Sequence, residues 1–382
     1  MTFGGDLLTW LAYSRYDSPE KESFDRLAST QELEQPAGRP IRSSDRSRQQ
    51  FPSLEAVVSE QQIQKVKVRR LAHVGLWSSD VATQARFYRQ VVGLDLRSSE
   101  VRTVGQEMEV EAASAFLALG DEHHCLALFA DTRDSRPGKA DSRFVLPQSR
   151  LHHMTFEVDT EAELAALAAR LNMLGVELAF EPRDGESERG DTLWFRDPDG
   201  NRIEISVTSD EAFTQYAAAS GRRQARLRPL ALQHLALQTP HLETMVEFYT
   251  EALGFDISDW LLREWAWLRC NTDHHTLVLI QGRPDVDHIG FRIDSGLDLL
   301  AWADYLSRQE APVLWGPGRH GAGHDLFLRF ADPEGCHIEL SAELEQYYDQ
   351  DVTTPPRLWH ARPRALNLWG TLPPWIKEEV SV

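Results

Sequence analysis

Three side chains that could bind a metal ion lie in short apolar stretches of the second half of the chain. They are His234 in "LQHLALQ", His288 in "DHIGFRI" and Glu339 in "CHIELS". Side chains alternate between the two faces of a strand, so these residues point away from apolar neighbours such as Leu235 and Ile289. The polar face must border a cavity or water, and the three can therefore converge inside one curved sheet. Two neutral imidazoles and one carboxylate form a facial triad, which leaves positions open for substrate and O₂ on an octahedral metal, typically Fe(II).

The same three residue types recur earlier in the chain as His73, His153 and Glu204. His288 follows His153 by 135 residues, and Glu339 follows Glu204 by the same number. A single histidine in an amphipathic strand is most often a half-buried structural residue. Three matched positions that occur twice make coincidence a poor account. The earlier set is predicted to be a second metal site or the vestige of one.

Pairs of adjacent histidines also occur twice, as His123-His124 in "LGDEHHCLAL" and as His274-His275 in "RCNTDHHTLV". Both stretches read as strands, and neighbouring side chains of a strand point to opposite faces. Only one histidine of each pair can therefore face a given cavity.

The elements that must position these residues form four similar units, which begin near residues 70, 150, 231 and 286. Units one and three each have a short strand pattern with a central histidine, a polar turn and a helical segment that contains Phe-Tyr. Units two and four close with the turns "DPDG" and "DPEG", which are typical of hairpins, and then with the glutamate strand.

This periodicity predicts four regions in the chain. They are a polar N-terminal extension (residues 1–65), an N-terminal two-module domain (66–220), a C-terminal two-module domain (221–345), which the resemblance described below makes the catalytic one, and a tail (346–382). The tail is rich in Trp and Pro, and we expect it to wrap the second half or a partner subunit.

Composition narrows the function classes. A formal net charge of −19 argues against binding nucleic acid or an anionic membrane through a basic field. No apolar run reaches the length of a membrane span, and the N-terminus lacks the features of a secretory signal. The three cysteines form no even framework, so we expect reduced thiols in a cytoplasmic protein.

At this point the sequence resembles the vicinal oxygen chelate superfamily, and within it the type I extradiol ring-cleavage dioxygenases of the catechol 2,3-dioxygenase kind. The resemblance spans roughly residues 70 to 345, and its most specific part is "LRCNTDHHTLVLI", "DHIGFRI" and "GPGRHGAGHDLFLRFADPEGCHIEL". It implies an α+β fold of four βαβββ modules paired into two open-barrel domains. It also implies a non-haem Fe(II) enzyme, with Mn(II) as the alternative metal, that cleaves a catechol-type ring with O₂ beside the diol. Members of the family are commonly homo-oligomers.

The resemblance assigns the residues that bind the metal directly to His234, His288 and Glu339. It assigns an acid–base histidine to His274, which stands 14 residues before His288 and would face the metal, while His275 would face outward or contact substrate. The apolar character of both strand faces leaves the reverse assignment open. A further family histidine, near the substrate hydroxyls, is matched to His324.

One position departs from the family. Arg329 stands where the family normally has a tyrosine, three residues before the Asp of the Asp-Pro turn. A guanidinium donates hydrogen bonds but cannot give up its proton as a phenol can, so Arg329 is predicted to supply fixed positive charge to a catecholate or a carboxylate. Arg319 and Arg292 are predicted to contact the substrate, although a solvated loop arginine is as good a reading of Arg319.

Two other functions remain open. A glyoxalase-like isomerase or epimerase would use the metal as a Lewis acid without O₂, but such enzymes commonly have a fourth metal ligand that this repeat lacks. A non-catalytic relative would only bind a small molecule, and would need no acid–base histidines. Measuring O₂ uptake with catechols separates the three.

Overall fold

The structure is a computed structural model of the chain. It describes residues 66–104, 109–120, 122–131, 149–182, 191–208, 227–349, 352 and 354–376. Residue contacts divide the chain into two units, residues 1–53 and 54–382, and every described residue belongs to the second. The predicted extension at residues 1–65 lies outside the described residues.

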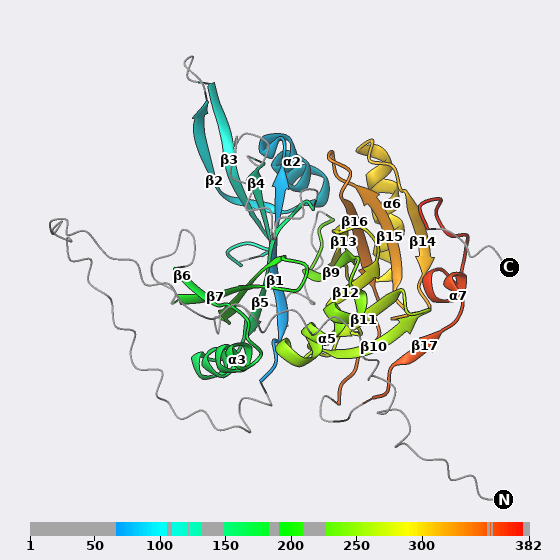
Figure 1. The fold of residues 1–382 in the computed structure, drawn as a ribbon. Helices are drawn as coiled ribbons and strands as arrows, with labels where there is room; N and C mark the ends of the chain where they lie inside the picture. The colour runs from blue at the N-terminus through cyan, green and yellow to red at the C-terminus, as the bar shows by residue number, and fades with distance from the viewer. Residues whose placement is uncertain are drawn as a thin grey trace, which may run out of the picture. The chain divides into compact units, whose positions relative to one another are not determined.

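The N-terminal half is built on an eight-stranded sheet (Figure 1). Its first module comprises β1 (Arg70–Ser78), α2 (Val81–Phe87) with the π-helical turn η2 (Tyr88–Val92), β2 (Asp95–Val104), β3 (Glu109–Ala118) and β4 (Leu126–Ala130). Its second comprises β5 (Leu151–Val158), α3 (Glu161–Met173), β6 (Ala179–Pro182), β7 (Asp191–Arg196) and β8 (Arg202–Val207).

The C-terminal half repeats this plan in a nine-stranded sheet. The third module comprises β9 (Ala231–Thr239), α5 (Leu242–Leu253), β10 (Asp256–Leu261), β11 (Trp265–Arg269) and β12 (Leu277–Gln281). The fourth comprises β13 (Asp285–Arg292), α6 (Gly296–Arg308), β14 (Trp315–Arg319), β15 (Leu326–Ala331) and β16 (His337–Ala342).

Strand pairing explains how each half presents one polar face. The first strands of the two modules pair antiparallel in the middle of each sheet, as β1 with β5 and β9 with β13. Each first strand also pairs in parallel with the last strand of its own module, for example β13 with β16. The predicted α+β fold of four βαβββ modules in two sheets is confirmed, whereas the domain boundaries at residues 65, 220 and 345 remain predictions.

Helices α2, α3 and α6 begin at residues whose side chains cap the first turn. The side-chain oxygens of Asp80, Thr160 and Ser295 accept hydrogen bonds from backbone N–H groups three residues later. Such caps satisfy donors that lack a partner in the first helical turn. Helix α5 ends at Gly254, whose φ of 77° is the left-handed conformation that favours glycine.

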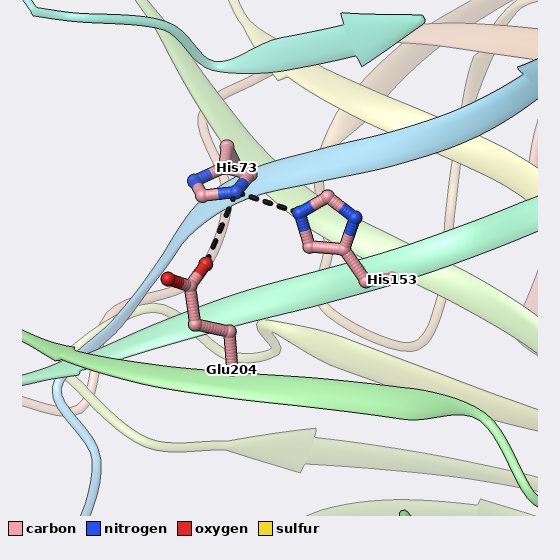
Figure 2. Close-up of side chains that lie close together, drawn as sticks. All are labelled: His73, His153 and Glu204. Atoms are coloured by element: carbon pink, nitrogen blue, oxygen red, sulfur yellow. Dashed lines mark hydrogen bonds and ion pairs between the residues drawn. The ribbon is translucent and has the colours of Figure 1, made fainter. Parts of the chain in front are cut away.

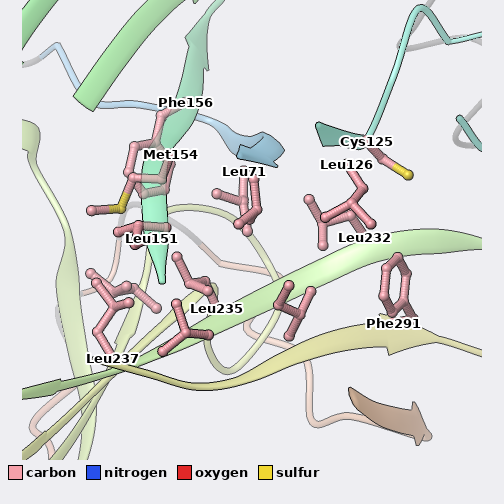
Figure 3. Close-up of a cluster of buried hydrophobic side chains, with 14 of the residues drawn as sticks. Leu71, Cys125, Leu126, Leu151, Met154, Phe156, Leu232, Leu235, Leu237 and Phe291 are labelled. Carbon is pink, nitrogen blue, oxygen red and sulfur yellow. The ribbon is translucent and has the colours of Figure 1, made fainter. Parts of the chain in front are cut away.

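The apolar faces of the two halves form one continuous core. Leu71 and Met154 from the first half and Leu235 and Phe291 from the second belong to the same cluster of buried side chains (Figure 3). Burying the apolar faces on each other leaves the polar faces of the sheets for the histidines and glutamates.

Reciprocal tyrosine–aspartate bonds join the halves where the sequence repeats its motifs. Tyr88, from the first Phe-Tyr pair, donates to Asp332 Oδ2 of the second Asp-Pro turn at 3.0 Å. Tyr249, from the second Phe-Tyr pair, donates to Asp197 Oδ2 of the first turn, also at 3.0 Å. The recurring motifs therefore specify the junction between the halves as well as the local turns.

The tail adds to the second half. Strand β17 (Arg357–Trp359) pairs in parallel with β10, and the short helix α7 (Arg362–Leu366) follows it. Among the described residues, no helix is long and apolar enough to cross a membrane.

Candidate metal centre

The C-terminal triad converges as the repeat predicted. His234 Nε2 lies 3.1 Å from His288 Nε2 and 3.4 Å from Glu339 Oε1. The three side chains are at most 2% exposed, and their ligand atoms all lie within 4.8 Å of one another. Two ligands about 2.1 Å from one ion and at right angles to each other lie about 3 Å apart, so the donor atoms fit a shared divalent ion.

Glycine at position 290 makes room for this convergence. On strand β13, Gly290 is directly opposite His234 of β9 on one side and Glu339 of β16 on the other. A Cβ at this position would run into the ring of His234. Because the residue between two ligands has no side chain, the space in front of the three donor atoms stays open.

The charge around His288 suits a neutral ligand nitrogen. Its Nδ1 is 2.6 Å from Asp287 Oδ1, an arrangement that directs Nε2 toward the triad. Burial and the Arg329 guanidinium lower the pKa of His288 to about 4. Burial alone would raise the pKa of Glu339, but Arg329 and His288 lower it well below its usual value. His288 is thus a neutral imidazole and Glu339 an ionised carboxylate, and together with the His234 imidazole they fit the predicted Fe(II) or Mn(II).

The orientation predicted for the histidine pair is wrong. His275, not His274, lies beside the triad, with its ring centroid 4.5 Å from that of His234. His274 points to the opposite face, where its Nε2 lies 3.3 Å from Asp259 Oδ2. Asp259 accepts further bonds from Trp359 and Arg357 of the tail, and this buried carboxylate holds His274 away from the metal side. Burial, with the neighbouring histidines, lowers the pKa of His275 well below its usual value.

The location predicted for His324 is also wrong. His324 is exposed, has a φ of 58° and lies beside Arg319. The histidine at the triad is His320, whose Nε2 is 3.4 Å from Glu339 Oε2. Its ring stacks on Phe327 with centroids 3.8 Å apart, and its Nδ1 lies 2.5 Å from the carbonyl oxygen of Leu366 in α7.

Sequence reasoning missed His320 because strand alternation does not extend across the turn that follows β14. The signal available was its place at the end of β14, the strand that pairs with the strand of Arg329. Burial lowers the pKa of His320, but Asp325 and Glu339 raise it, and the net change is upward. The site thus has two flanking histidines with opposite pKa shifts, His275 lowered and His320 raised.

Arg329 lies at the triad, directly opposite Glu339 in the β15–β16 ladder. Its Nε donates to Glu339 Oε2 at 2.5 Å, and its Nη1 donates to Asp287 Oδ1 at 3.3 Å. The guanidinium also lies over the ring of Trp315, 4.9 Å from the centroid. Glu339 can therefore present Oε1 to the metal while Arg329 fixes Oε2.

The other two predicted arginines lie elsewhere. Arg319 donates to the His324 carbonyl and to Glu343, and its guanidinium lies over Trp369. Arg292 lines a cavity of about 470 Å³ that none of the triad residues lines. The structure thus brings neither Arg319 nor Arg292 to the triad.

The N-terminal triad also converges (Figure 2). His73 Nε2 lies 2.9 Å from His153 Nε2 and 3.4 Å from Glu204 Oε2, and the three side chains are at most 4% exposed. The ring of His124 lies 4.1 Å from that of His73, in the relation that His275 has to His234. Burial, with His152 and His124 nearby, lowers the pKa of His153 well below its usual value.

Comparison with known proteins shows the family. The family model of the Glyoxalase/Bleomycin resistance protein/Dioxygenase superfamily matches residues 70–205 and 231–340, more than half of the chain. The chain therefore belongs to this superfamily, in agreement with the four modules of the fold.

Individual relatives narrow the resemblance. The chain is 29% identical to metapyrocatechase 2 of Cupriavidus necator over 224 residues, which cover 52% of this chain and 66% of that protein. It is 24% identical to an iron-dependent extradiol dioxygenase of Rhodococcus jostii over 330 residues, which cover 80% of this chain and 97% of that protein. The solved structure of a Mn(II)-bound glyoxalase from Novosphingobium aromaticivorans matches with a TM-score of 0.65 and 27% identity, covering 81% of this chain and 94% of that one.

Proposed function

We propose that this protein is a non-haem Fe(II)-dependent extradiol dioxygenase that cleaves a catechol-type ring with O₂, breaking the bond beside the diol. The observation that carries the proposal is the buried convergence of His234, His288 and Glu339 with two further histidines at its edge. Similarity to a metapyrocatechase and to an iron-dependent extradiol dioxygenase supports the same reaction. Mn(II) is the alternative metal, because the donor set suits both ions.

A divalent ion on the triad would supply open positions at which vicinal hydroxyl oxygens and O₂ can bind side by side. The protein's part is to hold that ion by one face only. His234, His288 and Glu339 belong to three adjacent strands, so their donor atoms approach from the sheet.

His275 and His320 are the candidates for proton transfer. His275 lies on the side of His234, whereas His320 lies on the side of Glu339. We infer that one imidazole takes a proton from a substrate hydroxyl and the other gives one to oxygen as the ring opens. Positioned imidazoles suit both tasks near neutral pH.

The bond from His320 Nδ1 to the Leu366 carbonyl fixes the orientation of the ring and turns Nε2 toward the site. The tail is therefore part of the active site in this proposal, because it orients one of the two acid–base groups.

Arg329 is proposed to act mainly through Glu339. Its bonds to Glu339 and Asp287 hold the ligand carboxylate in one orientation and balance one buried and one half-buried negative charge. It cannot replace the phenol of a tyrosine as a proton donor.

The full-length protein is first reconstituted with Fe(II) under anaerobic conditions. The test then measures its uptake of O₂ once O₂ and a substrate are admitted. Catechol, 3-methylcatechol, 2,3-dihydroxybiphenyl and 3,4-dihydroxyphenylacetate are offered as substrates, with Mn(II) and metal-free protein in parallel. The proposal expects one O₂ consumed per ring and a coloured ring-opened product that has a new carboxylate and a new aldehyde or, where the cleaved carbon bears a substituent, a ketone. Absence of O₂ uptake with every diol, in protein shown to contain the metal, would refute it.

A second candidate is a metal-dependent isomerase, because a similar solved structure is described as a Mn(II)-bound glyoxalase. An isomerase would use the triad as a Lewis acid and would not need O₂. Conversion of the hemithioacetal of methylglyoxal and glutathione by anaerobic Mn(II) protein would favour it. Homo-oligomer formation and a cytoplasmic location remain predictions.

A further inference from the structure

We propose that the N-terminal half holds a second divalent metal ion, ligated by His73, His153, Glu204 and the hydroxyl of Thr155. This site is separate from the one proposed for catalysis. It would be more closed, because the protein supplies four donors to it.

The other three donor atoms all lie within 3.4 Å of His73 Nε2. Thr155 Oγ1 lies 2.8 Å from His73 Nε2 and 2.6 Å from Glu204 Oε2. His73 Nε2 in turn lies 2.9 Å from His153 Nε2, and Figure 2 shows the two rings turned toward each other above Glu204. Ligands of one ion that are about 2.1 Å from it and at right angles lie about 3 Å apart, so these spacings suit a shared cation.

The strand register explains why Thr155 belongs to the set. Thr155 of β5 is directly opposite His73 of β1 and Glu204 of β8. It therefore has the position that Gly290 has between His234 and Glu339 in the other half. A hydroxyl at that place adds one oxygen donor to the histidine and glutamate donors.

The surroundings orient His153 as a ligand. Its Nδ1 lies 2.7 Å from His152 Nδ1, which directs Nε2 toward His73. Gly75, opposite His153 in the β1–β5 ladder, makes room for the ring, because a Cβ there would run into it. The His153 ring is thus fixed from both sides.

Hydrogen bonds alone satisfy this cluster poorly. A neutral imidazole nitrogen has either one proton or one lone pair, yet His73 Nε2 has three polar atoms within 3.4 Å. A divalent ion accepts all four donors at once. Trp194 stands opposite Glu204 where Arg329 stands opposite Glu339, so the two carboxylates have different neighbours at this strand position.

Four protein donors leave fewer open positions on an ion than the three donors of the C-terminal triad, and this suits a structural ion. Structural metal sites are filled by protein ligands, whereas catalytic sites keep open positions. The ion would tie together β1, β5 and β8, which lie side by side in the sheet. We therefore expect it to stabilise the fold and not to take part in turnover.

The experiment counts Mn(II) bound per chain in full-length, chelator-stripped protein, from the loss of the free Mn(II) EPR signal. The variants are H288A/E339Q, H153A/E204Q and the combination of all four substitutions. We expect about two ions in the unaltered chain, about one in each double variant and none in the combination. Mn(II) should also raise the Tm of H288A/E339Q. A count of one in the unaltered chain, with none in H288A/E339Q, overturns the proposal whether or not the protein cleaves catechols.

Thr155→Val in the H288A/E339Q background tests the hydroxyl with little change in shape. If Thr155 is a ligand, Mn(II) occupancy at one fixed, limiting concentration falls at least about 10-fold. If occupancy rises instead, the hydroxyl takes the place of a cation in the natural protein, and the proposal is wrong. Far-UV circular dichroism with and without Mn(II) shows that each variant is folded.

Discussion

The two halves of this protein use one backbone plan and one set of metal-binding residue types, but they surround that set differently. In the N-terminal half, Thr155 lies between a histidine and the glutamate, and Trp194 faces the glutamate. In the C-terminal half these places belong to Gly290 and Arg329. The comparison indicates that a triad becomes a working site through its neighbours, because the triads themselves are closely similar.

The residue that contacts Nδ1 of the second histidine of each triad also differs between the halves. His288 has the carboxylate of Asp287 at its Nδ1, whereas His153 has a second imidazole, His152. Asp287 also binds Arg329, so the C-terminal half has a connected network of charges. Charged partners of this kind fix ligand geometry more strongly than neutral ones.

The largest difference in turnover between the two halves is expected when one metal ligand is removed from each half in turn. We expect His288→Ala to reduce ring cleavage to the background rate, because the ion would lose one of its three protein donors. His153→Ala should lower turnover no more than a few-fold, through stability. Steady-state kcat with Fe(II)-loaded protein measures both. Equal loss in the two variants would contradict a division of labour between the halves.

The second-largest effect on turnover is expected from the flanking histidines, His275 and His320. His320→Ala or His275→Ala should lower kcat by about 10²–10⁴ while the metal content stays close to that of the unaltered protein. The control is His324→Ala, which changes an exposed side chain and should stay within about 2-fold. A large loss in His324→Ala, with none in His320→Ala, would restore the assignment made from the sequence.

His275 and His320 also show which parts of the site can be predicted from the sequence and which cannot. The repeat predicted the modules and both triads, because ligands on regular strands obey a period of two and the offset of 135 residues is the same for His153 and Glu204. Where the chain turns, that period gives no direction. His320 follows β14 directly, and tertiary contacts such as the stacked Phe327 and the Leu366 carbonyl decide where its ring points.

The orientation of the histidine pair was predicted wrongly for a related reason. His274 and His275 lie in a segment whose two faces are both buried, so polarity could not distinguish them. The choice is made by Asp259, which binds Arg357 and Trp359 of the tail and faces His274. A contact between residues about 100 positions apart leaves no local pattern in the sequence.

A smaller difference between the halves is expected from substitution of the glycines that make room for the histidine rings. Each half places a glycine opposite one of its two histidines, but Gly290 faces His234, whereas Gly75 faces His153. Gly290→Ala should displace the His234 ring and lower kcat by about 10²-fold, the usual cost of a misplacement near 1 Å. Gly75→Ala should displace His153 and lower Mn(II) occupancy of the N-terminal set instead. The reverse pattern would show that the catalytic ion lies in the first half.

The last prediction concerns the junction between the halves, where stability and not turnover should depend on pH. Burial raises the pKa of Asp197 to about 7, and it also raises the pKa of Asp332. An acid with a raised pKa binds more protons in the folded state, so its favourable contribution is complete below about pH 4 and is lost as the pH rises through 7. The free energy of unfolding should therefore fall by on the order of 3 kcal/mol between pH 5 and pH 8. Urea unfolding across this range should show a flatter profile in Asp197→Asn than in the matched Asp332→Asn, and equal profiles in all three proteins would show that Asp197 is ionised throughout.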